Sequence, residues 1–271
     1  MEVIQEPDVV EPEPPSAGHQ PVPIYSYVIL GGIAAVFVAQ MLCGDVFRGA
    51  SDSILAGDER SAIAAGFVKP FFLHYHQYWR ILTGAAVHGG LLHVVMNGYA
   101  FFLFGRLIEL LSNRAYLAIV FLLSCIGGGL LSLLFIPDGV SVGASGGIVG
   151  MLGYMTVYAF RRRRFVSTQF RKSLLINIGS VLVFGLILFN VVDNYGHIGG
   201  LITGAVYALV QIPSNEYTDP RVVSPVTKAL GIAALSIWIA TCLLSIVLIF
   251  NYRNVPLPKT LDAPSSSSST R

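Results

Sequence analysis

Charged residues are scarce in this chain. Only 12% of its 271 residues are charged, whereas a soluble domain carries about 25%. Hydrophobic residues make up 54% of the sequence instead, and they gather in long runs; roughly 20 consecutive apolar residues are enough for a helix to cross a bilayer. This composition excludes an ordinary soluble domain and predicts an integral, multi-pass membrane protein embedded in the lipid bilayer.

Basic clusters and cysteine pairs are scarce too. The net charge is only +2, and apart from the run Arg161–Arg164 the basic residues are dispersed, so we predict no nucleic-acid surface. The stretch HYH at 74–76 has no convergent carboxylate, so we predict no metal site and no cofactor. The three cysteines have neither paired nor metal-ligand spacing, and we interpret them as packing or lipid-facing residues: Cys43, Cys125 and Cys242.

The two ends of the chain are polar. Residues 1–22 are rich in proline and contain five acidic residues but no lysine or arginine. The lack of a basic start argues against a cleaved signal peptide, and the composition predicts a disordered cytoplasmic tail. Residues 252–271, which include the run SSSSST, are expected to form a second disordered tail.

The apolar runs predict an all-α membrane protein with six helices in a core and one additional C-terminal transmembrane helix. The core covers residues 23–212, and a linker at 213–227 leads to the last helix, which we expect to be an appendage away from the site. Residues 44–90 are aromatic-rich and are predicted to form a structured loop in the membrane interface. The seven spans are expected at 25–43, 91–111, 115–136, 144–160, 173–190, 194–212 and 228–251.

The basic residues between the fourth and fifth spans predict the orientation. Arg161–Arg164, Arg171 and Lys172 lie in this short loop, and basic residues in short loops stay in the cytoplasm. The N-terminus is then cytoplasmic, while the 44–90 loop and the C-terminus lie outside. The arginine run is also expected to contact anionic lipids. Because no transit peptide is recognisable, we expect the inner or plasma membrane of a bacterium.

Polar residues stand at the start of three spans. His93 and Asn97 open the second span, Ser145 the fourth and His197 the sixth. Polar groups within a span cost about 2.5–3.5 kcal/mol when ionisable, so they usually serve a function. These three spans run in the same direction by alternation. The four side chains are therefore expected at similar depth, near the outer membrane face.

Glycine stripes indicate how the fourth and sixth spans meet. Small residues at a spacing of three or four allow two membrane helices to pack closely. One stripe consists of Gly146, Gly150 and Gly153, and the other consists of Gly196, Gly200 and Gly204. Packed together, the stripes would bring the Ser145 hydroxyl within reach of the His197 imidazole.

A serine beside a histidine permits nucleophilic acyl transfer, because the histidine removes the hydroxyl proton. The Ser145 amide, His93 and Asn97 are candidates for stabilising the oxyanion. Asp193 precedes His197 by four residues, so it orients the base only if the chain doubles back. A Ser145/His197 dyad is the simpler hypothesis.

These residues resemble those of the rhomboid intramembrane serine proteases over about residues 44–212. The resemblance rests on Trp79-Arg80, on His88, His93 and Asn97 in HGGLLHVVMN, on Gly105 and Glu109 in FGRLIE, on Gly143 and Ser145 in GASG, and on GHIGG around His197. It implies that Ser145 is the nucleophile, that His197 is its general base, and that His93 and Asn97 bind the oxyanion. His88, Trp79, Arg80 and Glu109 are expected to support the site by packing or hydrogen bonding, and single-span membrane proteins are the implied substrates.

One residue departs from the family pattern, and several alternatives stay open. Many members have an aromatic residue four positions after the serine, where this chain has Val149. Arg80 either pairs with a carboxylate such as Glu109 or reaches the headgroups. Ser145 also fits a small residue at a helix crossing, and His197 a buried histidine bonded to a backbone carbonyl. The glycines around Ser145 resemble the nucleophile elbow of soluble hydrolases, but the preceding SLLFIPDGVSV is too short and the composition is wrong for a soluble sheet. Competing functions are an inactive rhomboid-like protein that binds or escorts membrane proteins, and a small transporter.

Overall fold

The computed structural model describes residues 22–43, 59–189 and 191–255. The predicted tails at 1–21 and 256–271, and the first part of the predicted interfacial loop at 44–58, lie outside the described residues. Seven helices of 17 residues or more occur in the described part, and they coincide with the seven apolar segments of the sequence. They are α1 (Ile24–Cys43), α6 (Leu91–Leu111), α7 (Arg114–Phe135), α8 (Ser145–Arg161), α9 (Thr168–Ile187), α10 (Asn194–Gln211) and α11 (Pro225–Tyr252).

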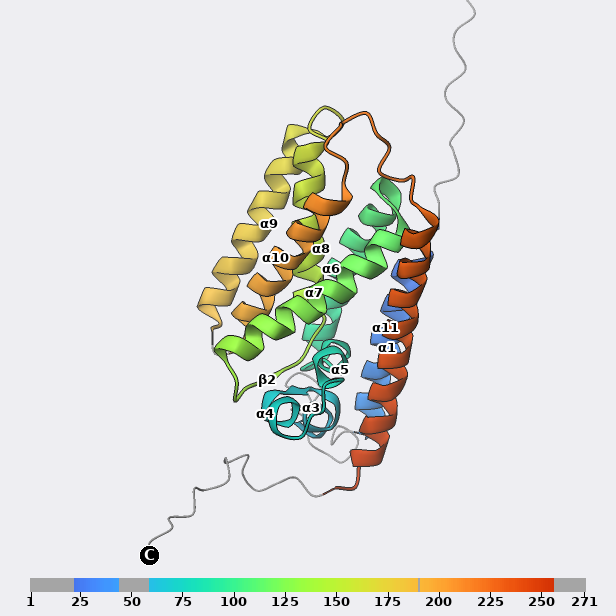
Figure 1. Cartoon of the computed structure of the whole chain (residues 1–271). Coiled ribbons are helices and arrows are strands. Elements are labelled where there is room, and N and C mark those ends of the chain that lie inside the picture. The colour runs from blue at the N-terminus through green and yellow to red at the C-terminus, as the bar shows by residue number, and fades with distance from the viewer. Residues whose placement is uncertain (1–21, 44–58, 190, 256–271) are drawn as a thin grey trace, which may run out of the picture.

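The chain is an integral membrane protein by its helices. Five helices of the described part are long and apolar enough to cross a membrane: α1, α6, α7, α9 and α11. The other two are the shortest of the seven, with 17 residues in α8 and 18 in α10. They pack against each other and against α7. A run of buried residues fills α8 from Gly147 to Met155, so this helix occupies the middle of the bundle (Figure 1).

The segment before α6 is folded, as the prediction of a structured loop requires. It contains α3 (Glu59–Ala65), α4 (Lys69–His74) and α5 (Arg80–Ala86), which gather at one end of the bundle (Figure 1). The rings of Tyr75, Tyr78 and Trp79 are more than 40% exposed, and such rings favour the membrane interface.

A short strand pair departs from the predicted all-α fold. Strand β1 (Phe67–Val68) pairs with β2 (Val140–Ser141) in antiparallel register, so that Phe67 lies opposite Ser141. Further backbone bonds join Lys69 N to Gly139 O at 3.2 Å and Gly143 N to Gly84 O at 2.9 Å. The chain that leads into α8 is therefore fixed to the folded loop on both sides of β2.

Helix α11 is an integral part of the bundle, and the expectation of an appendage was wrong. It packs along α1 and also contacts α3, α5 and α7 (Figure 1). Trp238 is only 1% exposed, its ring lies 4.9 Å from that of Phe121, and its indole nitrogen donates to Ile29 O at 3.4 Å. Burying a tryptophan between two helices stabilises the bundle by several kcal/mol. As predicted, α11 does not line the cavity described below.

Candidate active site

Ser145 begins α8, and a glycine turn presents it. Gly143 has φ +114°, a backbone conformation that glycine adopts at no steric cost. A Cβ at this position would lie 2.7 Å from His93 Cε1, so only glycine fits between the turn and that ring. Ala144 is the N-cap and provides no side-chain hydrogen bond. The Ser145 hydroxyl is therefore free of a capping role at the start of a helix, where the dipole is positive.

The two glycine stripes meet and set the register of α8 against α10. A Cβ at Gly200 would lie 2.0 Å from Gly146 O, and one at Gly204 would lie 1.9 Å from Gly150 O. Both contacts have the same offset, 54 residues (200 minus 146, and 204 minus 150), so the two helices run parallel. By this offset His197 is level with residue 143, about 3 Å along the axis from Ser145 at 1.5 Å per residue.

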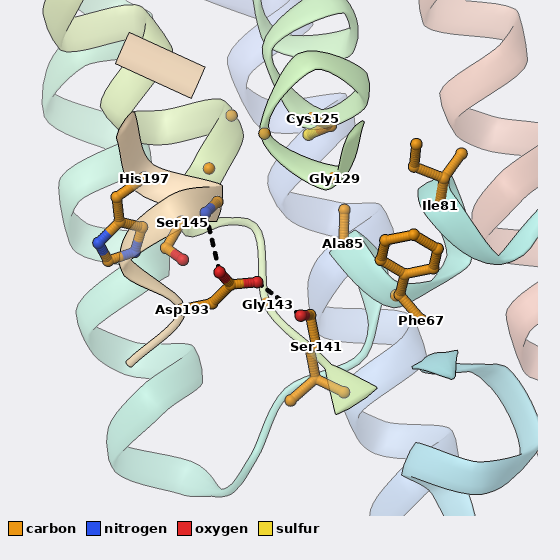
Figure 2. Close-up of a pocket in the computed structure, with 16 residues that line it drawn as sticks. Phe67, Ile81, Ala85, Cys125, Gly129, Ser141, Gly143, Ser145, Asp193 and His197 are labelled. Carbon is orange, nitrogen blue, oxygen red and sulfur yellow. Dashed lines mark hydrogen bonds between the residues drawn. The ribbon is translucent and has the colours of Figure 1, made fainter. Parts of the chain in front are cut away.

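Ser145 and His197 line one cavity. It has a volume of about 50 Å³, enough for water, and both side chains border it together with Asp193 and Ser141. Figure 2 shows the serine hydroxyl and the imidazole on the same side of the cavity, above Asp193. The two side chains come from the starts of α8 and α10, as the sequence predicts. In the described residues no hydrogen bond joins them, and such bonds are often longer in the absence of substrate.

The His197 ring is only partly fixed. Its Nδ1 atom is buried and has no hydrogen-bond partner in the described part of the chain. Val149, four positions after Ser145, is 7% exposed, and no aromatic stacking on His197 is found among the described residues. The imidazole is thus positioned by α10 and by the cavity walls.

Among the described residues, no side-chain hydrogen bond joins Asp193 to His197; the carboxylate of Asp193 connects three elements instead. Its Oδ1 accepts from Gly196 N at 2.8 Å and so caps α10. Its Oδ2 accepts from the Ser141 hydroxyl of β2 at 2.5 Å (Figure 2). The same oxygen accepts from the Ser132 hydroxyl of α7. The start of α10 is thereby tied to the strand that leads to Ser145. The Ser145/His197 dyad considered from the sequence stays a prediction.

Lys69 is a buried cation near this carboxylate. It is 1% exposed, and burial lowers the pKa of its ammonium group, while the charge of Asp193 opposes that shift. Sequence reasoning missed both Lys69 and the serine bridges of Asp193. Nothing in the local pattern signals them, because the partners are far apart in the chain.

His93 lies directly behind the glycine turn. Its ring contacts Gly143, and its Nδ1 accepts from Gly89 N at 3.2 Å. Because Nδ1 is an acceptor, the neutral ring carries its proton on Nε2. Asn97 follows one turn later and donates to His93 O at 2.9 Å, while its Oδ1 is buried and has no partner among the residues that the structure describes. Neither side chain lines the small cavity itself.

His88 contacts the turn that leads into Ser145. The ring is 1% exposed, its Nδ1 lies 3.1 Å from Ala86 O, and its Nε2 accepts from Ala144 N at 3.5 Å. The side chain of Gln40 in α1 forms two hydrogen bonds with the backbone of His88. Its Nε2 donates to His88 O at 2.9 Å, and its Oε1 accepts from His88 N at 3.0 Å. His88 therefore links α1 and α5 to the residue before Ser145.

The buried His88 predicts a loss of stability in acid. Burial, and secondly the charge of His93, lower the pKa of His88 from 6.5 to about 3, although the bond to Ala86 opposes this. Between these values the unfolded chain binds a proton that the native chain does not. Stability is therefore unaffected by this group above pH 6.5 and falls by about 1.4 kcal/mol per unit as the pH drops toward 3. Thermal unfolding in detergent at pH 7, 6, 5 and 4 should show a steeper decline for the parent than for His88→Asn. Parallel declines would contradict the assignment.

Three residues expected beside the site lie elsewhere or act differently. Glu109 is at the far end of α6, about 24 Å from His93 by helical rise, and it accepts from Ser26 N and Ser26 Oγ of α1, each at 2.7 Å. Trp79 precedes α5 and is 43% exposed. Neither residue lines the cavity. The expectation that Glu109 supports the site locally was wrong, whereas a supporting role of Trp79 stays a prediction.

Arg80 follows neither of the alternatives considered from the sequence. It is 3% exposed and donates to Ile63 O at 3.0 Å and to Gly66 O at 2.8 Å. Its guanidinium carbon lies 4.9 Å from the centre of the Phe71 ring. In the described segments Arg80 pairs with no carboxylate, and its side chain does not reach the surface. It fixes the turn between α3 and β1.

The arginine run after α8 holds the chain that follows α10. The buried Arg162 donates to the carbonyls of Pro213, Asn215 and Thr218. Arg161 donates to the carbonyls of Leu209 and Ile212, and the exposed Arg163 and Arg164 lie near Glu216. Part of the run thus has a structural role that its charge alone does not predict.

Comparison with known proteins gives one consistent result. The Rhomboid domain matches residues 75–214, which include every residue of the cavity except Phe67. The chain is 31% identical over 156 residues to RHOMBOID-like protein 6, mitochondrial, of Arabidopsis thaliana, covering 54% of this chain and 48% of that protein. It is 33% identical over 146 residues to Rhomboid protease GluP of Bacillus subtilis (strain 168), covering 52% and 28%. It is 32% identical over 166 residues to Rhomboid-like protease 3 of Toxoplasma gondii, covering 60% and 62%. The chain thus spans less than two thirds of each of these relatives.

Proposed function

The chain belongs to the rhomboid family, and on that premise we propose that it is a serine endopeptidase that hydrolyses peptide bonds in or next to membrane spans. One observation carries the proposal. Ser145 and His197 begin two parallel helices that contact each other through glycines, and both side chains line the same cavity. A packing role for Ser145 would not require its hydroxyl to border a cavity beside an imidazole.

The proposed reaction begins with proton transfer. His197 accepts the Ser145 hydroxyl proton, and the oxygen attacks the carbonyl carbon of the scissile bond. His197 then gives the proton to the leaving amine, which releases the first product and leaves an acyl group on Ser145. Water, activated by the same histidine, hydrolyses the ester and restores the serine. No cofactor takes part in these steps.

The negative oxygen of the tetrahedral intermediate needs donors. The amide of Ser145 is available at the positive start of α8. His93 is a second candidate, because its Nδ1 is occupied by Gly89 N and its Nε2–H faces the Gly143 turn. The Asn97 amide is a third, provided it exchanges its bond to the His93 carbonyl for one to the intermediate.

A six-helix core with α11 as a seventh span is the proposed membrane arrangement. The positive run Arg161–Arg164 supports a cytoplasmic position for the loop after α8. The Ser145 end of the bundle then faces the outside, where a substrate span enters and unwinds. The substrates are proposed to be single-span membrane proteins, and a bacterial plasma membrane stays a prediction.

A combined labelling and cleavage experiment tests this function. The detergent-purified protein is incubated with a fluorophosphonate probe, and the adduct is located by mass spectrometry; a parallel sample receives a labelled single-span substrate. We expect the adduct on Ser145 and not on Ser141, the second serine of the cavity, together with cleavage in or beside the substrate span. The missing Ser145–His197 hydrogen bond favours the competing function, an inactive protein that binds or escorts membrane proteins. Substrate binding without an adduct or cleavage would support that competitor.

A further inference from the structure

A second cavity lies at the opposite end of the bundle from the site. It has a volume of about 550 Å³ and lies among the starts of α1, α7 and α11 and the segment that precedes α11. Its polar lining contains three cations, Arg114, Arg221 and Lys228, whereas no carboxylate lines it. All the charged groups in the lining of this cavity are thus positive.

The charges of this cavity are only partly balanced. Arg221 is held by Asp219 in a bidentate pair, with Nη2 and Oδ2 3.0 Å apart. Arg114 lies over the Tyr25 ring at 5.9 Å. In the described residues neither Arg114 nor Lys228 has a carboxylate partner. Within the described part of the chain, Arg114 and Lys228 therefore have no counter-charge.

The helix ends add to the imbalance. Arg114 is the first residue of α7 and Lys228 lies in the first turn of α11, and neither helix has an acidic residue in its first turn. A cation at the positive end of a helix dipole is unfavourable, whereas an anion there is stabilised. The start of α1 already receives a carboxylate, since Glu109 binds Ser26. The starts of α7 and α11 receive none among the described residues.

Part of the remaining lining is apolar. Val222, Val223 and Ile232 line the cavity. From Ile232, a strip of exposed apolar side chains continues along α11 through Ile239 and Leu243, which are 42% and 60% exposed. These residues are seven and eleven positions from Ile232 and so share one helix face. The ligand that fits has a small anionic head and an apolar tail.

We propose that this cavity binds the phosphate group of an anionic phospholipid, with Arg114 and Lys228 as its ligands and the lipid chain along α11. The proposed orientation puts the cavity at the cytoplasmic face, where anionic lipids attract basic residues. The site is separate from the peptidase chemistry. Its failure would leave the proposed function untouched.

Native mass spectrometry of the full chain in detergent tests the proposal, with phosphatidylglycerol and phosphatidylcholine as probes. We expect a clear preference for phosphatidylglycerol. The double variant Arg114→Gln/Lys228→Gln should bind it about 30-fold more weakly, because each basic residue near an anionic surface contributes about fivefold. The matched control Arg163→Gln/Arg164→Gln removes two exposed charges of the same proposed face and should lose less than about threefold. The charge-conserving variant Arg114→Lys/Lys228→Arg should retain binding, which separates lost charge from misfolding.

Three results would overturn the lipid assignment. Equal binding of the two lipids would exclude a site for anionic headgroups, and equal losses in the two double variants would indicate general surface charge. Displacement by a synthetic peptide of residues 1–22 would instead assign the cavity to the acidic tail. Competition by inorganic phosphate at millimolar concentration would support the phosphate chemistry. If the phosphatidylglycerol preference persists in excess phosphate, the lipid is the source.

Discussion

The Ser145→Ala and His197→Ala variants should each lose cleavage of a single-span substrate, by at least about 10³-fold, together with labelling by a fluorophosphonate probe. The serine supplies the atom that attacks, and without the imidazole its hydroxyl keeps its proton and hardly reacts. Because the two residues act as a unit, the double variant should be no worse than either single variant. Initial cleavage rates and the intensity of the labelled band measure both effects.

The structure provides matched controls for these losses. Ser145 caps no helix and forms no side-chain hydrogen bond among the described residues, so its replacement by alanine should leave the unfolding midpoint unchanged. Ser180→Ala and His74→Ala alter the same residue types at exposed positions, and they should cleave like the parent. Labelling that persists in His197→Ala but disappears in Ser145→Ala would reveal another base. Full cleavage by Ser145→Ala would end the proposal.

The sequence predicted the helices and the convergence of Ser145 and His197 on one cavity, because both follow from patterns along the chain. Each span is a continuous apolar run, and the glycine stripes of α8 and α10 repeat at helical spacing. Alternation of direction then places Ser145 and His197 at one depth, and the contact of Gly146 with Gly200 agrees with it. This part of the site follows from the chain order alone.

The contacts that support the site were not predictable, because they join residues that are far apart in the chain. Strands β1 and β2 have two residues each and are separated by 71 positions, too short for any alternation to appear. Gln40 and His88 are 48 positions apart, and Asp193 reaches Ser132 across 61. Such bonds depend on how the helices pack, which hydrophobic patterns do not specify.

Family motifs also say nothing about which partner a side chain contacts. Glu109 belongs to the FGRLIE motif and was grouped with the site, yet it holds α1 at the other end of α6. Trp238 lies in no recognisable motif, although it joins α11 to the core. In both cases the residue stabilises helix packing at a distance from the cavity.

The contact between α8 and α10 predicts that Gly200→Leu abolishes both stability and activity. A Cβ at this position already lies 2.0 Å from Gly146 O, and the obstructing atom is backbone, which cannot rotate away. Overpacking a core typically costs about 1–3 kcal/mol; here the two helices must separate, so we expect more than about 3 kcal/mol. Separation moves Ser145 from His197, and cleavage should fall to background. Thermal unfolding in detergent and cleavage rates measure the two effects.

Gly179→Leu is the control for this substitution, because nothing lies within 4 Å of a Cβ at Gly179 on the exposed side of α9. Leucine favours a helix over glycine by about 1 kcal/mol, so this variant should be as stable as the parent or more stable. Gly200→Ala should fall between the two, since it adds the clashing atom without the rest of the side chain. The order Gly179→Leu, Gly200→Ala, Gly200→Leu in falling activity is what direct backbone contact requires. A fully active Gly200→Leu would mean that α8 and α10 are not in contact at the level of the dyad, and the proposed proton transfer would lose its geometric basis.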